Sequence, residues 1–380
     1  MCYVRQQDDH ATHVNWRLQM IRRCLASVGA LAAVLAVVSL ASVHAGGQVP
    51  TAAATTQSAA AKTWSPPRTP WGEPDLQGVY RYVGATPLQR PKDFGAREFL
   101  TDAEVAQRTK AEQERLAKNL AGADGRSPLT ESTLESGALN SFWLESGTAK
   151  IVSNRTSLIV GPDGQIPYTS EMRARAAAQA EVHAGRYPTP FFHQSWLEFE
   201  TEERCLTHGV PGAMLGGNGE GPNQILQSPG YVVILQESFI DRRTIPTDGR
   251  PHGNIRTWRG DSVGRWEGDT LVVETINFAD KSHYRWASDK LWRSATDTLR
   301  LVERFTRVDA DTIDYQFTIE DPVKFTRPWT AAVPITKLSV PLLESGCHEG
   351  NYATINTLSA VRNLEKAAAE AAKKGKKGSR

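Results

Sequence analysis

The nine residues Thr312-Ile313-Asp314-Tyr315-Gln316-Phe317-Thr318-Ile319-Glu320 alternate strictly between polar and apolar side chains. Successive side chains of a β-strand point to opposite faces of the sheet. This stretch therefore predicts a strand with one buried face and one solvated face. Residues that favour turns stand on both sides of it, Asp309-Ala310-Asp311 before and Asp321-Pro322 after. The segment is the clearest sign of a β-sheet in the chain.

Further stretches rich in Val, Ile and aromatic residues predict additional strands. They cover residues 78–83, 224–227, 231–237, 239–245, 270–277, 298–307 and 327–338. Neighbouring strands joined by turns of a few residues must be antiparallel, because a parallel pair needs a long crossover. A meander of this length with one apolar face removes its edges by closing on itself. The predicted fold is mainly β, an antiparallel meander closing into an up-and-down barrel.

Two or three peripheral helices and one extra hairpin are predicted beside this meander. The helices cover residues 101–121, 169–185 and 359–373. Thr101 and Glu104 have the spacing of a capping box, in which each side chain bonds the backbone N–H of the other residue. The turn Gly161-Pro162-Asp163-Gly164 predicts a hairpin over 155–168.

The first 45 residues contain the features of an export signal. Arg22 and Arg23 precede an apolar run, and Val43 and Ala45 supply the small side chains of a cleavage site before Gly46. The apolar run is shorter than the ~20 residues of a spanning helix, so we expect no stable membrane span. A retained N-terminal anchor is the alternative. The sequence thus predicts a periplasmic or secreted protein.

We accordingly expect four parts in the chain. Residues 1–45 are predicted to be a presequence with a signal peptide, for which Met20 is the expected start, and residues 46–68 a disordered linker. Residues 69–356 are predicted to form a single β-rich domain with helical insertions, and residues 357–380 a C-terminal helix and basic tail. The formal net charge of +2 gives no support for a nucleic-acid partner, in spite of the basic tail.

Cys205 and Cys347 are the two cysteines that remain after the presequence. In an oxidising compartment a single disulfide between them is the favoured interpretation. Free thiols are one alternative. A metal site is the other, because Cys205 and His208 have C-x2-H spacing, but the pattern matches no standard zinc module. We therefore expect a structural disulfide and no metal.

Three phrases of the sequence resemble a family of exported bacterial proteins of unassigned function. They are Thr69-Pro70-Trp71-Gly72 with Pro74-Asp75-Leu76-Gln77-Gly78, the run Gly264-Arg265-Trp266-Glu267-Gly268-Asp269-Thr270-Leu271-Val272-Val273-Glu274-Thr275, and Cys347-His348-Glu349-Gly350-Asn351-Tyr352. The chain is also loosely similar to lipocalin-like (calycin) barrels. Those barrels open on Gly-x-Trp, where this chain has Gly78-Val79-Tyr80. This second resemblance implies a barrel with a ligand in its lumen.

Glu237 and Glu303 are the first candidates for chemistry, because each shares a strand face with apolar residues. Burial raises the pKa of a carboxyl group toward neutrality, which suits general acid–base work. The favoured alternative is a structural ion pair with an inward arginine, Arg243 or Arg304. His348, beside Glu349, is a third acid–base candidate because histidine titrates near neutral pH.

Aromatic residues in the β region are candidates for lining a pocket. Trp258, Trp266 and Trp329, with Tyr315 and Arg243, are the residues expected to hold a ring-bearing or lipid-like ligand. Ordinary core packing is the alternative for the tryptophans.

No nucleotide loop and no nucleophile motif occurs in the sequence, and no cofactor is expected. We therefore predict an exported barrel that binds a small, partly apolar molecule in its lumen. An extracytoplasmic isomerase, lyase or hydrolase that uses a Glu or His in the same barrel is the first alternative. An envelope interaction protein is the second.

Overall fold

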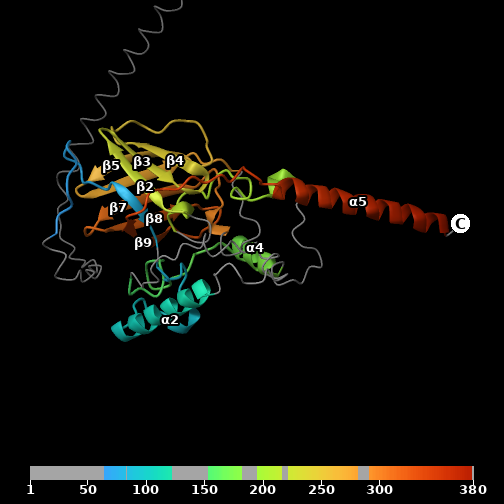
Figure 1. Ribbon diagram of the computed structural model, residues 1–380, viewed down its shortest axis with the longest axis horizontal. Helices are drawn as coiled ribbons and strands as arrows, with labels where there is room; N and C mark the ends of the chain where they lie inside the picture. Colours follow the sequence, from blue (N-terminus) through green and yellow to red (C-terminus); the bar gives the residue numbers. More distant parts are fainter. Residues whose placement is uncertain are drawn as a thin grey trace, which may run out of the picture. The chain divides into compact units, whose positions relative to one another are not determined.

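The alternating segments form one antiparallel sheet of nine strands (Figure 1). The computed structural model describes residues 64–82, 84–121, 153–181, 195–215, 221–280 and 291–378. The strands are β1 (Gly78–Arg81), β2 (Asn223–Ser228), β3 (Tyr231–Gln236), β4 (Asp241–Pro246), β5 (Asp261–Glu267), β6 (Thr270–Ile276), β7 (Arg300–Arg307), β8 (Thr312–Glu320) and β9 (Trp329–Leu338). Their order is β4-β3-β2-β1-β9-β8-β7-β6-β5.

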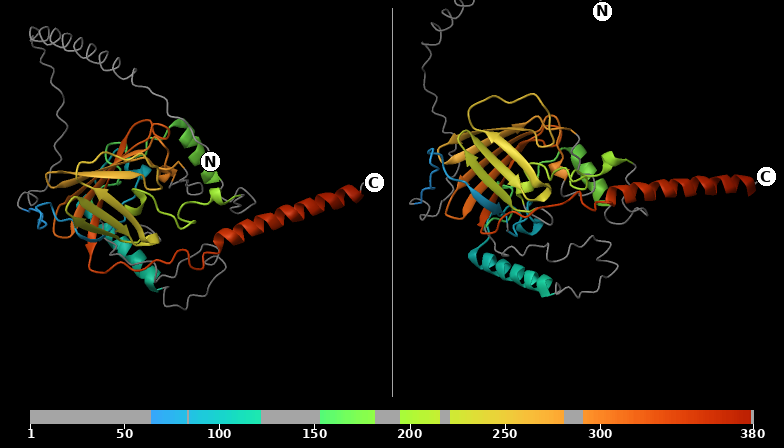
Figure 2. Two further views of the ribbon diagram at one scale, coloured as in Figure 1. Left: turned by 90° about the horizontal axis from the view of Figure 1, so that it is seen from above. Right: turned by 45° about the horizontal axis from the view of Figure 1, so that its top comes forward.

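Strands that follow one another in the sequence pair with each other, except β4 and β5, which are the two edges of the sheet. The first strand, β1, also pairs with the last, β9. The sheet is therefore an up-and-down meander nearly closed into a barrel, as the alternation predicts. Figure 2 shows the yellow strands β2–β4 and the orange strands β7–β9 on opposite sides of the interior.

The seam of the barrel lies between the edge strands β4 and β5. A Cβ atom built on Gly264 of β5 would lie 2.9 Å from Ile245 Cγ2 of β4, closer than side chains tolerate. Ile245 is fully buried although it lies on an edge strand. Glycine at position 264 therefore lets the two edges approach closely and cover the interior.

Large side chains fill the middle of the barrel. Phe305, Tyr315 and Phe317 are wholly buried, and their rings follow one another at centroid distances of 4.8 and 5.9 Å. Trp292 stacks on Phe317 at 5.9 Å, and Trp329 meets the same ring edge-on at 5.8 Å. Each buried side chain of this size contributes about 1.5–3 kcal/mol to stability. The interior is thus a packed core over most of its length.

One end of the barrel is plugged by the segment before β1. Leu76 is wholly buried there. Its N–H donates to Gln227 Oε1 at 2.7 Å, and Gln227 Nε2 donates to the Pro74 carbonyl at 3.1 Å. Arg307, at the end of β7, donates to the Asp75 carbonyl at 2.9 Å. These bonds hold the plug across strands from both halves of the sheet.

The three helices of the described chain are α2 (Asp102–Ala121), α4 (Ser170–Glu181) and α5 (Ala353–Gly378). The predicted capping box is confirmed, since the Thr101 N–H donates to Glu104 Oε2 at 2.8 Å and the Glu104 N–H to Thr101 Oγ1 at 3.3 Å. Helix α5 begins earlier than predicted and includes most of the basic tail. Among the described residues, no helix is long and apolar enough to cross a membrane.

Two segments of the chain differ from the prediction in whether they form strands. The hairpin over 155–168 does not form; instead Arg155, Ile159 and Tyr168 make single bridges to Phe99, Ala331 and Phe325. Strand β5 was not predicted, because Asp261-Ser262-Val263-Gly264-Arg265-Trp266-Glu267 contains few apolar residues. The predicted presequence, residues 46–63 of the linker and residues 182–185 of the second helix lie outside the described residues.

A buried ion pair between Lys324 and Asp321 lies at the β8–β9 connection, with the Lys324 Nζ atom 3.3 Å from Asp321 Oδ2. Lys324 also donates to the carbonyls of Trp292 and Ser294. Burial lowers the pKa of Lys324 from its usual 10.5 to about 8. The charged form of this lysine is therefore less favoured in the folded chain than in water.

The free energy of unfolding should consequently rise by about 2 kcal/mol between pH 7 and pH 9.5. The unfolded lysine stays protonated in this range, so the unfolded chain binds more protons than the folded one and stability increases with pH. Urea unfolding at stepped pH measures the effect. Lys324→Met should lose this gain, and Lys366→Met on exposed α5 should keep it. A flat profile for the unsubstituted protein would contradict the prediction.

Candidate ligand-binding site

Arg243, Glu303 and Tyr315 form a polar group inside the barrel. Glu303 lies between Leu301 and Phe305 on the inward face of β7 and is wholly buried. Arg243 of β4 donates from Nη1 to Glu303 Oε2 at 2.5 Å and from Nη2 to Oε1 at 3.1 Å. The Tyr315 hydroxyl donates to Oε1 at 2.8 Å. The prediction that Glu303 faces the interior and meets an arginine is confirmed.

The surroundings of Tyr315 keep its hydroxyl protonated, so that it can donate a hydrogen bond to Glu303. Burial, with the neighbouring Glu303 carboxylate, raises the pKa of Tyr315 well above its usual range. The phenol therefore stays protonated at neutral pH and satisfies one oxygen of the carboxylate. Because Arg243 is on the edge strand β4 and Glu303 is on β7, the third strand from the other edge, the pair links the two sides of the seam through the interior.

A small cavity of about 30 Å³ lies beside Arg243, at the end of the barrel where β3 ends and β4 begins. Its barrel wall consists of Asn223, Ile234, Gln236, Asp241, Arg242, Arg243 and Arg259, and its roof consists of Gly209, Val210, Pro211, Ala213 and Met214. This volume is far below the ~300–1,000 Å³ typical of ligand pockets and corresponds to about two water molecules. A larger molecule fits beneath the roof only if the roof moves away from the barrel.

Polar contacts fasten the roof to the barrel. Thr207 Oγ1 donates to Asp241 Oδ2 of β4 at 2.6 Å. Asn223 Nδ2 of β2 donates to the Ala213 carbonyl at 3.1 Å. Met214 is almost fully buried. The roof is thus held at both sides of the cavity.

The charges around the cavity are largely paired with one another. Arg243 is engaged by Glu303, and Arg259 forms an ion pair with Asp241. Burial lowers the pKa of Arg259. Arg242 is exposed at the rim. The inner surface of the cavity therefore presents no strong net charge to a ligand.

Asn223 and Gln236 bring polar atoms into the cavity wall. They are direct partners in the register of β2 and β3, and their residues are only 2% and 3% exposed. Asn223 Oδ1 and Gln236 Nε2 are buried and form no hydrogen bond with any residue that the structure describes. A buried polar atom without a partner costs about 1–3 kcal/mol, so this pair needs an explanation.

The structure corrects the prediction for Glu237. The inward residues of β3 are Val232, Ile234 and Gln236, whereas Leu235 and Glu237 belong to the other, partly exposed face. Glu237 follows the strand, and its Oε2 accepts a hydrogen bond from the Leu343 N–H at 2.7 Å. It does not share the interior with Glu303, because the predicted register of β3 is wrong by one residue.

The predicted tryptophans do not line one pocket. Trp329 is buried among the core rings. Trp266 is half-buried at the end of β5, which the register places at the plugged end of the barrel. Trp258 precedes β5 and is contacted by the Arg204 guanidinium, 5.3 Å from its ring centre. None of the three lines the cavity that the structure describes at the opposite end.

His348 is exposed, whereas Glu303 is wholly buried, so the two acid–base candidates are not brought together. Glu349 lines a separate depression of about 590 Å³ with Glu202 and Glu203. Arg304, the other arginine considered for an inward pair, instead contacts Glu267 on the exposed face at 3.0 Å. The structure thus leaves the Arg243–Glu303 group as the one candidate near a cavity, among the residues that it describes.

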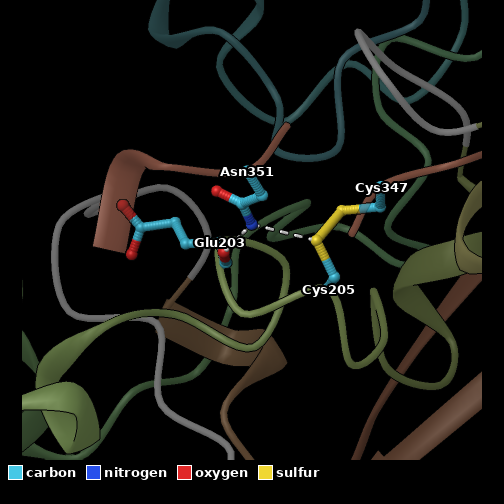
Figure 3. Close-up of a disulfide and its surroundings, with 4 residues drawn as sticks. All are labelled: Glu203, Cys205, Cys347 and Asn351. Atoms are coloured by element: carbon cyan, nitrogen blue, oxygen red, sulfur yellow. Dashed lines mark hydrogen bonds between the residues drawn. A yellow bond between two sulfur atoms is a disulfide. The ribbon is translucent and has the colours of Figure 1, made fainter. Parts of the chain in front are cut away.

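Cys205 and Cys347 are joined by a disulfide with a Cα–Cα distance of 5.7 Å, as predicted (Figure 3). Asn351 reinforces the connection: its Nδ2 lies 3.1 Å from both the Glu203 carbonyl and Cys205 Sγ. The bond joins the segment before the cavity roof to the segment before α5. No group of three or more potential ligands that could hold a metal ion occurs among the described residues.

Sequence reasoning missed Asn223 and Gln236, the two polar residues of the cavity wall. Both stand at the ends of strands, where a polar residue is expected to meet solvent. Gln236 could have been predicted from the alternation Val232, Ile234, Gln236, which places it on an apolar face. The neighbouring alternation Tyr231, Val233, Leu235 is equally apolar and obscured it.

In the comparison with known proteins, no family model, no curated protein and no solved structure matches the chain.

Proposed function

We propose that this chain is an exported barrel protein that binds a small, partly apolar molecule at the end of the barrel opposite the plug. The nearly closed barrel, with a small cavity at this end, supports the proposal. The cavity is lined by Val210, Pro211, Met214 and Ile234 and by the polar residues Asn223 and Gln236, and its roof, residues 209–214, must move outward to admit the ligand. The packed middle of the barrel restricts the ligand to this end.

Export is part of the same proposal. The charged, apolar and small-residue segments before Gly46 are typical of a signal peptide. The Cys205–Cys347 disulfide is consistent with a periplasmic or secreted protein, because such bonds persist in oxidising compartments. We also propose membership of the exported bacterial family that the three sequence phrases resemble.

The enzymatic alternative has less support from the geometry. A general acid or base must reach the substrate, and its carboxyl group must exchange a proton with it. Glu303 has no exposed surface and is occupied by Arg243 and Tyr315. This arrangement favours a structural ion pair at Glu303.

A bound molecule should therefore accompany the protein when it is purified from cells that export it. Extraction and mass spectrometry should find one compound near equimolar amount. Ala213→Phe fills the cavity beneath the roof and should lose the compound, whereas Ala360→Phe, the same change on exposed α5, should retain it. A compound bound equally by both variants would place ligand binding elsewhere and contradict the proposal.

A further inference from the structure

Positive charge is concentrated at the C-terminal end of the chain. Residues 362–380 contain seven lysine and arginine side chains and two glutamates, a net charge of +5, whereas the whole chain has a formal net charge of +2. Residues 1–361 therefore have a net charge of −3. An anionic surface attracts the C-terminal end and repels the rest of the chain, so the charge distribution favours one docking end.

Helix α5 contains most of this segment and presents it to solvent. Val361 is buried, and every later α5 side chain whose exposure the structure describes, as far as Lys374, is exposed. Arg362 and Glu365 form an ion pair with each other at 2.8 Å. The exposed lysines beyond this pair are therefore accessible to a partner.

The number of lysines exceeds what the helix itself needs. The sequence places Lys373, Lys374, Lys376 and Lys377 within five positions at the C-terminal end of α5. A cation near the C-terminus of a helix complements the helix dipole, but like charges three or four positions apart destabilise a helix. An anionic surface that neutralises these lysines would remove their repulsion.

Exposed apolar side chains occur in the same part of the chain. Tyr352, Ile355 and Leu364 are 66%, 64% and 53% exposed. Ala368 and Ala371 follow Leu364 at spacings of four and three, so these three residues form one apolar line along α5. A lipid bilayer offers both anionic headgroups and an apolar interior, whereas the backbone of a nucleic acid offers phosphate charge alone. The combination favours a lipid surface.

We propose that α5 docks the protein on the surface of an anionic phospholipid bilayer. The helix lies in the plane of the interface, with Leu364, Ala368 and Ala371 toward the acyl chains and its basic residues among the anionic headgroups. The net negative remainder of the chain stays away from the surface. The docking end is separate from the cavity of the barrel, so this inference does not depend on ligand binding.

Co-sedimentation with vesicles tests the proposal. The exported protein should bind vesicles of phosphatidylglycerol and phosphatidylcholine in equal parts, and vesicles of phosphatidylcholine alone should leave it in solution. Each basic residue near an anionic surface improves partition about fivefold at low salt. The combined change of Lys373, Lys374 and Lys377 to Gln should therefore weaken binding about 100-fold. Mass spectrometry of the protein first verifies that the apolar presequence has been removed, because that segment would bind vesicles itself.

The matched control removes the same charge elsewhere. The combined change of Lys92, Lys110 and Lys337 to Gln alters three exposed lysines outside α5 and should leave vesicle binding within about threefold. Leu364→Gln should weaken binding to anionic vesicles several-fold and leave any binding to double-stranded DNA unchanged, because only the bilayer takes up the apolar side chain.

Three outcomes would overturn the proposal. The first is equal binding to the two kinds of vesicle, and the second is an equal loss of binding in the two triple-lysine variants. The third is tighter binding to double-stranded DNA than to anionic vesicles at the same phosphate concentration, which would assign the basic end to nucleic acid. Each of them leaves the proposed ligand-binding function of the barrel standing.

Discussion

Glu303→Gln should lower the free energy of unfolding by about 3–5 kcal/mol, because it removes the charge that compensates Arg243 inside the barrel. The glutamine preserves the shape of the side chain, so no cavity contributes to the loss. Its amide N–H₂ group would also face the Arg243 guanidinium, which cannot accept a hydrogen bond. Urea unfolding monitored by tryptophan fluorescence measures the change.

Two further variants identify the cause of that loss. Replacing both partners in Arg243→Met with Glu303→Leu removes two charges together and should recover most of the stability, since paired apolar replacements are often neutral. Glu320→Gln, at the exposed end of β8 where it meets Arg300, should cost less than about 1 kcal/mol. If Glu303→Gln is as stable as the unsubstituted protein, the pair is not a structural element and Glu303 becomes a candidate for catalysis again.

The alternation of β7 and β8 predicted these inward residues correctly because only one face of each strand is apolar. In β8 the polar residues Thr312, Asp314 and Thr318 leave one possible buried face. Strand β3 differs, because apolar residues occupy both faces, Val232 and Ile234 on one and Val233 and Leu235 on the other. A period of two cannot choose between such faces, so Glu237 was placed inside and Gln236 outside.

Contacts between distant segments explain the other differences. Residues 155–168 contain residues that favour a hairpin turn. Instead of pairing with each other, Ile159 bridges to Ala331 of β9 and Tyr168 bridges to Phe325. The cavity roof, residues 209–214, is defined by its bonds to β2 and β4. Pairing between segments so far apart in the chain is set by tertiary packing, which local propensity does not describe.

The three sequence segments that resemble an exported bacterial family lie at places that hold this barrel together. The first contains Leu76 and closes the plugged end. The second forms the β5–β6 hairpin, with Gly264 at the seam and Gly268 at a positive φ of 61° in the turn. The third holds Cys347 and Asn351 of the disulfide region. They therefore lie at the plug, at the seam and at the disulfide, and the cavity wall lies outside all three.

Loss of the Cys205–Cys347 disulfide should lower the free energy of unfolding about as much as disruption of the Arg243–Glu303 ion pair. The bond joins residues 142 positions apart, so the loop that it closes contains nearly the whole barrel. For a loop of this length, the restriction of the unfolded chain corresponds to about 5 kcal/mol of stability. A protein of ordinary stability, about 5–15 kcal/mol, would then be close to unfolding at physiological temperature.

Cys205→Ser and Cys347→Ser should each reproduce this loss, and a reductant should destabilise the unsubstituted protein but neither variant. Binding should weaken together with stability, because the bond anchors the segment that leads into the cavity roof at Thr207. Thermal unfolding with and without reductant measures the first effect, and titration of the ligand measures the second. Mass spectrometry after alkylation verifies that the bond is broken. Full stability of a protein with both thiols alkylated would show that the non-covalent contacts of the barrel suffice to hold the fold.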